Sequence, residues 1–234
     1  MDFVLRLIEI IGVISFSAAG AMIAIDKETD FFGVIILSGV TCFGGGLTRD
    51  IVVGDGLPAF FSMSLELTIC VATAVVIFLA AAAFKREYVA EEAFVNKINN
   101  ILDALGIGVF AAAGTGMYIS YGPLVAIFAG TVTSVGGGLV RDIILREIPF
   151  ILTKRIYAVA VIIGSSLYYV FETYVFAGFE ESSVISTIIC VSVVFGIRMC
   201  ATKFNLNLPK AIIFDRIRAE NETSEAESKA EQLK

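Results

Sequence analysis

Long apolar runs alternate with short polar turns along most of this chain. Seven runs reach about 20 residues, the length that an α-helix needs to cross the ~30 Å hydrocarbon layer of a membrane. They cover about residues 3–25, 31–53, 62–84, 101–121, 123–145, 156–176 and 184–204. The pattern therefore predicts an all-α membrane protein with seven transmembrane helices.

The spans divide into two similar sets of three. The sequence GGGLTRD at 44–50 returns as GGGLVRD at 136–142, and FSAAG at 16–20 returns as FAAAG at 110–114. We therefore expect a first three-helix repeat over residues 1–84, a charged cytoplasmic connector with a short surface helix over 85–100, and a second repeat over 101–177. An extra seventh helix follows at 178–204, and a polar, disordered cytoplasmic tail at 205–234. Because three is odd, the second copy must enter the membrane from the opposite side, which makes the repeats inverted.

Composition agrees with a membrane protein and excludes several kinds of chemistry. Hydrophobic residues make up 57% of the chain and charged residues only 17%, against about 25% charged in soluble domains. Histidine is absent, which excludes imidazole metal ligands and Ser–His catalysis. The four cysteines lack CxxC spacing, so we expect them to be buried and reduced. We expect no enzyme activity, no catalytic residue, no metal, no cofactor and no nucleic-acid partner.

Lysine and arginine fall almost entirely on one side of the predicted membrane. One side collects Lys27, the basic residues of 85–100 and 146–155, and seven more from Arg198 onward, whereas the other side has only Arg6. Cytoplasmic loops carry the excess of lysine and arginine. The N-terminus is therefore predicted outside and the C-terminus in the cytoplasm.

The duplicated glycine motif is costly in a membrane helix. Glycine weakens a helix by roughly 1 kcal/mol relative to alanine, and a charge at mid-membrane costs roughly 3 kcal/mol or more. The glycines could serve close helix packing, or they could break each helix and expose carbonyls to a polar path. The duplication favours the path. Its predicted lining is Gly44, Gly45, Gly46, Thr48, Arg49, Asp50, Ser134, Gly136, Gly137, Gly138, Arg141 and Asp142.

The two arginines need partners at their own depth. Adjacent helical residues point about 100° apart, which argues against Asp50 and Asp142. Glu9 lies at the depth of Arg49, and Asp103 at the depth of Arg141. We therefore predict the supporting ion pairs Arg49–Glu9 and Arg141–Asp103. Two further acids, Glu66 and Glu172, have no obvious partner.

The paired GGGxxRD motifs, the three-plus-three-plus-one spans and the outward N-terminus resemble the prokaryotic trimeric intracellular cation (TRIC) channel family. The resemblance covers about residues 1–204. It implies a homotrimer in a prokaryotic inner membrane, with one K⁺-conducting pore per protomer between the kinked second and fifth helices. Animal members carry a lysine–glutamate–valine motif that engages an inositol lipid, and residues 47–50 (LTRD) depart from it. The expected partners are two further copies of the chain, membrane lipid and K⁺.

A second function fits the same architecture. Inverted repeats with broken helices also build secondary transporters, in which helix N-termini can hold a substrate carboxylate. Related prokaryotic sequences have been labelled glycine transporters. The sequence thus leaves open a carrier of glycine or another small amino acid.

Overall fold

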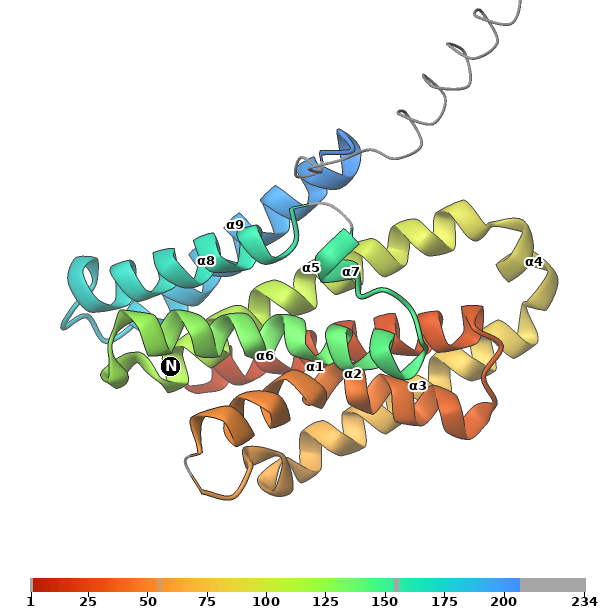
Figure 1. The fold of residues 1–234 in the computed structure, drawn as a ribbon, viewed down its shortest axis with the longest axis horizontal. Coiled ribbons are helices and arrows are strands. Elements are labelled where there is room, and N and C mark those ends of the chain that lie inside the picture. The colour runs from red at the N-terminus through yellow and green to blue at the C-terminus, as the bar shows by residue number, and fades with distance from the viewer. Residues whose placement is uncertain (1, 55, 154–155, 207–234) are drawn as a thin grey trace, which may run out of the picture.

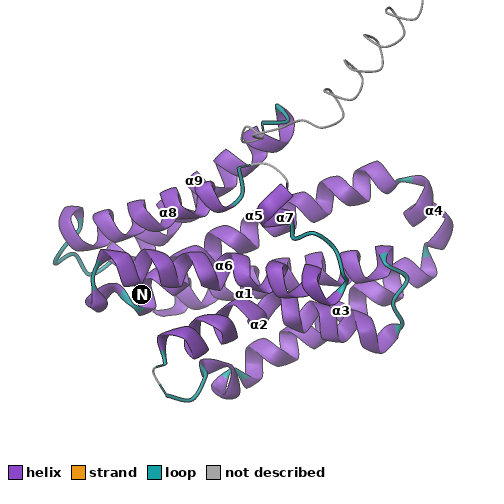
Figure 2. Cartoon of the chain, viewed as in Figure 1, coloured by secondary structure: helices purple, strands orange, loops and turns teal. Residues whose placement is uncertain are grey.

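The computed structural model describes residues 2–54, 56–153 and 156–206, and these form helices and connecting loops without strands (Figures 1 and 2). Within these described residues, seven helices are long and apolar enough to cross a membrane, which confirms the predicted class. They are α1 (Asp2–Asp26), α2 (Phe31–Val53), α3 (Ser64–Ala83), α5 (Glu92–Met117), α6 (Pro123–Ile144), α8 (Ala158–Val170) with its π-helical extension η3 (Phe171–Val175), and α9 (Ser182–Lys203). Short helices join them: η1 (Ala59–Ser62), α4 (Lys85–Ala90), η2 (Ile119–Tyr121) and α7 (Phe150–Thr153).

The ends of the helices follow from local signals. Before α2, the Asp30 carboxylate accepts a hydrogen bond from the Gly33 N–H at 2.7 Å, which caps the first turn. After α2, Gly54 adopts the left-handed conformation with φ of 73°, which glycine enters without steric cost. These two signals explain why α2 begins and ends at the residues predicted from the sequence.

The predicted connector 85–100 differs from the structure in part. Residues 85–90 form the short helix α4, as expected, but residues 92–100 are the first turns of α5. The first turns of a helix can be polar and extend beyond its apolar span. Hydropathy alone therefore predicts the start of α5 at about residue 101, later than in the structure. The predicted disorder of the tail concerns residues 207–234, which lie outside the described residues.

Equivalent helices of the two repeats run antiparallel across the molecule (Figure 1). Between α1 and α5, Gly12 lies against Val109 and Phe16 lies against Gly106, so the contacts advance along one helix as they retreat along the other. Phe16 also stacks on its repeat equivalent Phe110, with ring centroids 5.0 Å apart. This arrangement is the one expected of inverted repeats.

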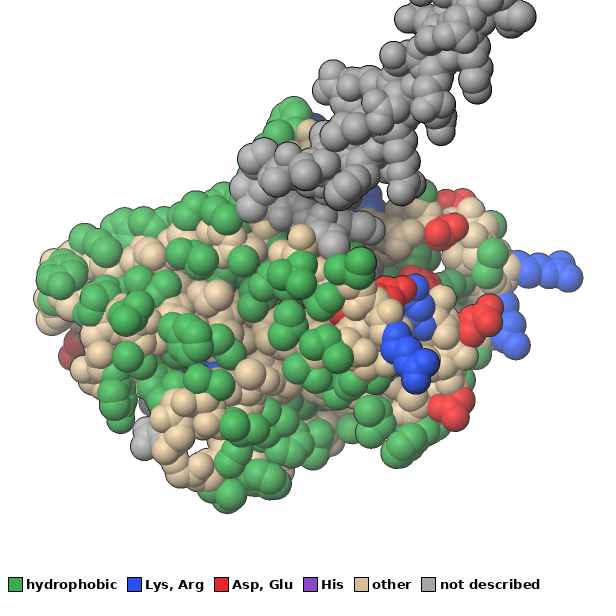
Figure 3. Space-filling view, viewed as in Figure 1, with side chains coloured by type: hydrophobic (Ala, Val, Ile, Leu, Met, Phe, Trp, Pro, Cys, Tyr) green, Lys and Arg blue, Asp and Glu red, His purple; other side chains and the backbone are tan. Residues whose placement is uncertain are grey.

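The helix α9 stands outside the two repeats and packs against α5 and α8. Figure 3 shows lysine and arginine side chains gathered at the end of the molecule that carries α4. At that end Lys27 pairs with Glu147, and the Tyr88 hydroxyl lies 3.4 Å from Asp26 Oδ1. Burial, followed by the charge of Asp26, raises the pKa of Tyr88 to about 12, so its hydroxyl stays protonated at neutral pH.

Candidate functional site

The glycine motifs meet where α2 crosses α6. A Cβ atom added at Gly45 would lie 2.1 Å from the carbonyl oxygen of Thr133, and one at Gly137 would lie 2.1 Å from that of Thr41. Only glycine permits such an approach of backbone to backbone. The helical backbone runs unbroken through both motifs, so the predicted helix breaks are wrong.

The three glycines of each motif have different surroundings. Gly44 and Gly136 also face the other helix, with Cβ positions 3.3 Å from Gly137 Cα and 2.9 Å from Gly45 Cα respectively. Gly46 and Gly138 instead face the guanidinium of their own helix: a Cβ there would lie 3.8 Å from Arg49 Nη2 and 3.6 Å from Arg141 Nη2, and the one at Gly138 also 3.8 Å from the Tyr157 hydroxyl. Two glycines of each motif therefore serve packing, and the third leaves room beside an arginine.

The crossing places the two arginines on opposite sides of the glycine contact. Arg49 lies one turn after Gly45 in α2, and Arg141 lies one turn after Gly137 in α6. One turn is about 5.4 Å along the axis, and the register of the glycine contacts makes these helices antiparallel. Both residues are buried, with 4% and 3% of their surface exposed.

Each arginine is held by the aspartate that follows it. The Nε and Nη2 groups of Arg49 donate to Asp50 Oδ1 at 2.8 and 2.7 Å, and those of Arg141 donate to Asp142 Oδ1 at 2.9 and 2.8 Å. Both nitrogens donate to one carboxylate oxygen, and such charge-assisted hydrogen bonds are stronger than those between neutral groups. The charge of each arginine is thereby balanced within its own motif.

The second carboxylate oxygen of each aspartate, Oδ2, accepts a hydrogen bond from the segment that follows the motif. Asp50 Oδ2 accepts from the Ala59 N–H and Asp142 Oδ2 accepts from the Phe150 N–H, both at 2.9 Å. Ala59 and Phe150 begin the short helices η1 and α7, where backbone N–H groups lack helical partners. The aspartates therefore bridge a buried guanidinium to a helix start, twice.

These contacts overturn the predicted pairs Arg49–Glu9 and Arg141–Asp103. Glu9 lies 3.7 Å from Arg6 instead, and Asp103 pairs with Arg198 at 3.1 Å. Neighbouring Cβ atoms do diverge on a helix, but the long arginine side chain can fold back onto the adjacent carboxylate. The expectation that Asp50 and Asp142 would be free to face an aqueous path is wrong for the same reason.

The two arginines differ in their remaining donors. Arg49 Nη1 donates to Thr133 Oγ1 at 3.2 Å, and its guanidinium lies 5.6 Å from the Tyr118 ring centre. Arg141 Nη1 is buried and has no hydrogen-bond partner within the described part of the chain. The inverted repeats are thus chemically unequal at this point.

The predicted hydroxyls bond their own helices. Thr48 Oγ1 donates to the Gly44 carbonyl at 2.7 Å, and Ser134 Oγ donates to the Thr131 carbonyl at 3.0 Å. Hydroxyls within helices commonly bond the preceding turn in this way. Ser134 is buried, whereas Thr48 is half-buried.

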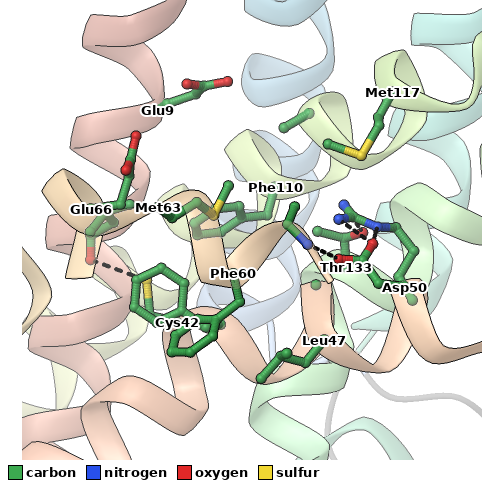
Figure 4. A pocket seen from close by; sticks show the side chains of 16 residues that line it. Glu9, Cys42, Leu47, Asp50, Phe60, Met63, Glu66, Phe110, Met117 and Thr133 are labelled. Atoms are coloured by element: carbon green, nitrogen blue, oxygen red, sulfur yellow. Dashed lines mark hydrogen bonds and ion pairs between the residues drawn. The ribbon is translucent and has the colours of Figure 1, made fainter. Parts of the chain in front are cut away.

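A cavity of about 110 Å³ opens beside Arg49. Its polar lining comprises Arg49, Asp50, Thr133, Glu9 and Glu66. Figure 4 shows Glu9 and Glu66 at one end and Asp50 and Thr133 at the other, with Phe60, Met63 and Phe110 between them. On the Arg141 side, a cavity of only about 20 Å³ is lined by Arg141, Asp103, Asn99, Asn100, Tyr157, Ile23 and Phe150, which is room for about one water.

The sequence did not reveal a buried cluster around Arg198. This residue of α9 is 0% exposed, donates to Asp103 Oδ2 and lies 4.3 Å from the Tyr157 ring centre. The Tyr157 hydroxyl donates to Asp103 Oδ1 at 3.1 Å. The count of lysine and arginine includes Arg198 among the cytoplasmic charges. Its position inside the predicted span 184–204 is the sequence feature that indicates a charge within the membrane.

Two acids that lacked partners in the sequence have them in the structure. Glu66 accepts from Arg6 Nη1 at 2.7 Å, and Glu172 accepts from the hydroxyls of Ser182 and Ser183 at 3.0 and 2.7 Å. The four cysteines are free thiols, of which Cys42, Cys70 and Cys190 are buried as expected, and Cys200 is exposed.

Known proteins resemble this chain over most of its length. The model of a family described as "Glycine transporter" matches residues 6–82 and 100–173, which include most of α1–α3 and most of α5–α8. The UPF0126 inner membrane protein YadS of Escherichia coli K12 is 31% identical over 208 residues, covering 86% of this chain and 93% of YadS.

Solved structures of related proteins share the fold of this chain. The crystal structure of a prokaryotic TRIC channel in 0.5 M KCl matches with a TM-score of 0.75 and 29% identity, covering 89% of this chain and 100% of the other. The TRIC orthologue from Rhodobacter sphaeroides matches with a TM-score of 0.72 and 27% identity, covering 87% and 99%. These neighbours are channels rather than enzymes.

Proposed function

Because the chain belongs to the glycine transporter family and has the fold of prokaryotic TRIC channels, we propose that it conducts monovalent cations, chiefly K⁺, across a bacterial inner membrane. In this proposal each protomer of a homotrimer holds its own pathway between α2 and α6. The N-terminus lies outside and the C-terminus in the cytoplasm.

The observation that carries the proposal is the pair of neutralised arginines on either side of the glycine crossing. A bare arginine would repel a cation strongly in a low-dielectric site. Here each guanidinium is bonded to an adjacent carboxylate, so the two sites present polar atoms with little net charge. Cavities with some charged and polar side chains in a largely apolar lining flank both sites, and the crossing separates them.

The lining of the pathway therefore differs from the one inferred from the sequence. Unbroken helices keep the carbonyls of α2 and α6 within their own hydrogen bonds, so side chains and cavities supply the polar surface. Conduction then requires the crossing to loosen, since Gly45 and Gly137 bring the backbones into contact in the present conformation. Bistable helix packing of this kind is a common basis of switching.

A K⁺ flux assay in proteoliposomes tests the proposal. Wild-type protein should carry K⁺ down its gradient, and Gly45→Leu should abolish the flux, because the leucine side chain would fill the space between α2 and α6 that opens when the crossing loosens. Gly39→Leu is the matched control, because a Cβ at Gly39 meets nothing within 4 Å. Absence of flux in well-folded wild-type vesicles would refute the channel.

One observation favours a second function, the transport of glycine. The cavity beside Arg49 joins a guanidinium with two acids, Glu9 and Glu66, and a small zwitterion carries one charge of each sign. Saturable uptake of labelled glycine by the same vesicles, without K⁺ flux, would identify a carrier.

A further inference from the structure

A second and larger cavity lies between α1, α5, η3 and α9. Its volume is about 400 Å³, within the range of small-ligand sites. Its polar lining is Glu9, Tyr168, Glu172, Ser183 and Thr187, and its apolar wall includes Leu5, Ile8, Val109, Ala112 and Ile119. Among the described residues, no lysine or arginine lines this side cavity.

Glu172 lines this side cavity, and only one of its two carboxylate oxygens accepts hydrogen bonds. Its Oε1 accepts from Ser182 and Ser183, in the first turn of α9, where hydroxyls and the helix dipole stabilise a negative charge. Its Oε2 is shielded from solvent and has no hydrogen-bond partner among the described residues. A buried carboxylate oxygen without a partner is costly, so a donor in the cavity would remove that cost once the carboxylate turned to bring Oε2 toward it.

The backbone and a second acid support the same conclusion. Glu172 lies on the π-helical turn Phe171–Val175, and such turns are frequent at functional sites. Glu9, on the α1 wall, keeps only a 3.7 Å contact with Arg6, whose nearer partner is Glu66 at 2.7 Å. Two carboxylates that can accept further hydrogen bonds therefore line a cavity whose described lining includes no lysine or arginine.

The residues that line the side cavity indicate which kind of cation it would bind. A bare metal ion needs several converging oxygen ligands, and no group of three or more acidic, histidine or cysteine side chains in the described ranges could hold one. A primary ammonium group needs only a few acceptors, and the carbon atoms attached to it can contact Ile8, Val109 and Ile119. We propose that the side cavity binds a primary ammonium group, with Glu172 as its main acceptor and Glu9 as the second.

Two sources carry this group: a soluble amine, or the ethanolamine headgroup of a membrane lipid. The loop between α8 and α9 lies at the same end of the molecule as the start of α1 (Figure 1). Glu172 lies in the last turn of the span Ala158–Val175, where we expect the lipid headgroups. The site does not depend on ion conduction.

Two binding measurements on the full-length protein test the inference and separate the sources. Calorimetry with ethanolamine on detergent-solubilised protein tests the soluble amine. Native mass spectrometry from nanodiscs of phosphatidylethanolamine or phosphatidylglycerol tests the lipid. Glu172→Gln should weaken whichever ligand binds by at least tenfold, since the amide can still accept from the serines but carries no charge. Glu180→Gln, an exposed acid near the same loop, should change binding less than twofold.

Either ligand, bound by the wild type and lost in Glu172→Gln, supports the site and identifies its source. If Glu172→Gln does not fold, Glu9→Gln provides the test, because Glu9 is partly exposed and weakly paired. Binding of neither ethanolamine nor phosphatidylethanolamine by the wild type would overturn the inference. Equal binding by the wild type and the charge-neutral variants would also overturn it.

Discussion

Adding one methyl group at the glycine crossing should separate α2 from α6. In Gly45→Ala the new Cβ would lie 2.1 Å from the Thr133 carbonyl oxygen, where ordinary contacts begin at 3.4 Å. The obstacle is backbone, which cannot rotate away as a side chain can. The helices must therefore part by about 1 Å, and overpacking of this kind costs typically 1–3 kcal/mol.

Helix propensity acts in the opposite direction and has to be subtracted. Alanine is better than glycine in a helix by roughly 1 kcal/mol. Gly39→Ala, in the same helix with nothing within 4 Å of its Cβ, should show that gain without the clash. The free energy of unfolding of Gly45→Ala should therefore fall about 1–3 kcal/mol below that of Gly39→Ala.

The assay is reversible unfolding in mixed micelles, followed by circular dichroism, on both variants and on Gly137→Ala. Gly137→Ala should behave like Gly45→Ala, because its Cβ would lie 2.1 Å from the Thr41 carbonyl oxygen. Equal stability of Gly45→Ala and Gly39→Ala would refute the close crossing.

Three further outcomes are expected. Arg49→Ala leaves the Asp50 carboxylate buried without its partner, which should cost about 3–5 kcal/mol of unfolding free energy; the double variant with Asp50→Asn should recover part of that loss, and no recovery would contradict the pairing. Arg198→Met removes the ion pair to Asp103, and thermal unfolding should show greater destabilisation than in Lys203→Met, a lysine in the last turn of the same helix; equal melting temperatures would argue against the cluster. Cys200 is the exposed thiol, so a membrane-impermeant maleimide should label it in inside-out vesicles only, and labelling in right-side-out vesicles would reverse the proposed orientation.

Most of the architecture could be predicted from the sequence because hydropathy and end signals report it directly. The bounds of α2 follow from Asp30 and Gly54, whose capping roles are local. The antiparallel relation of α1 to α5 follows from an odd number of spans per repeat. The start of α5 was placed too late because residues 92–100 are polar, and a polar helix beyond the membrane surface gives no hydropathy signal.

The partners of the charged residues could not be predicted, because they depend on side-chain reach and on a helix outside the repeats. Arg49 folds back onto Asp50, a contact that the directions of the Cβ atoms argue against. Membrane depth predicts Asp103 as the partner of Arg141, yet α9, which has no counterpart in the first repeat, supplies Arg198 to Asp103 instead. The glycines have two roles within one motif, and only the packed structure separates them.

Planar-bilayer recording of the purified protein under asymmetric KCl tests the central claim most directly. The proposed channel predicts discrete openings that reverse near the K⁺ equilibrium potential. It also predicts that these openings disappear in Gly45→Leu and persist in Gly39→Leu. A silent bilayer with folded wild-type protein, or currents that reverse near the Cl⁻ potential, would contradict it.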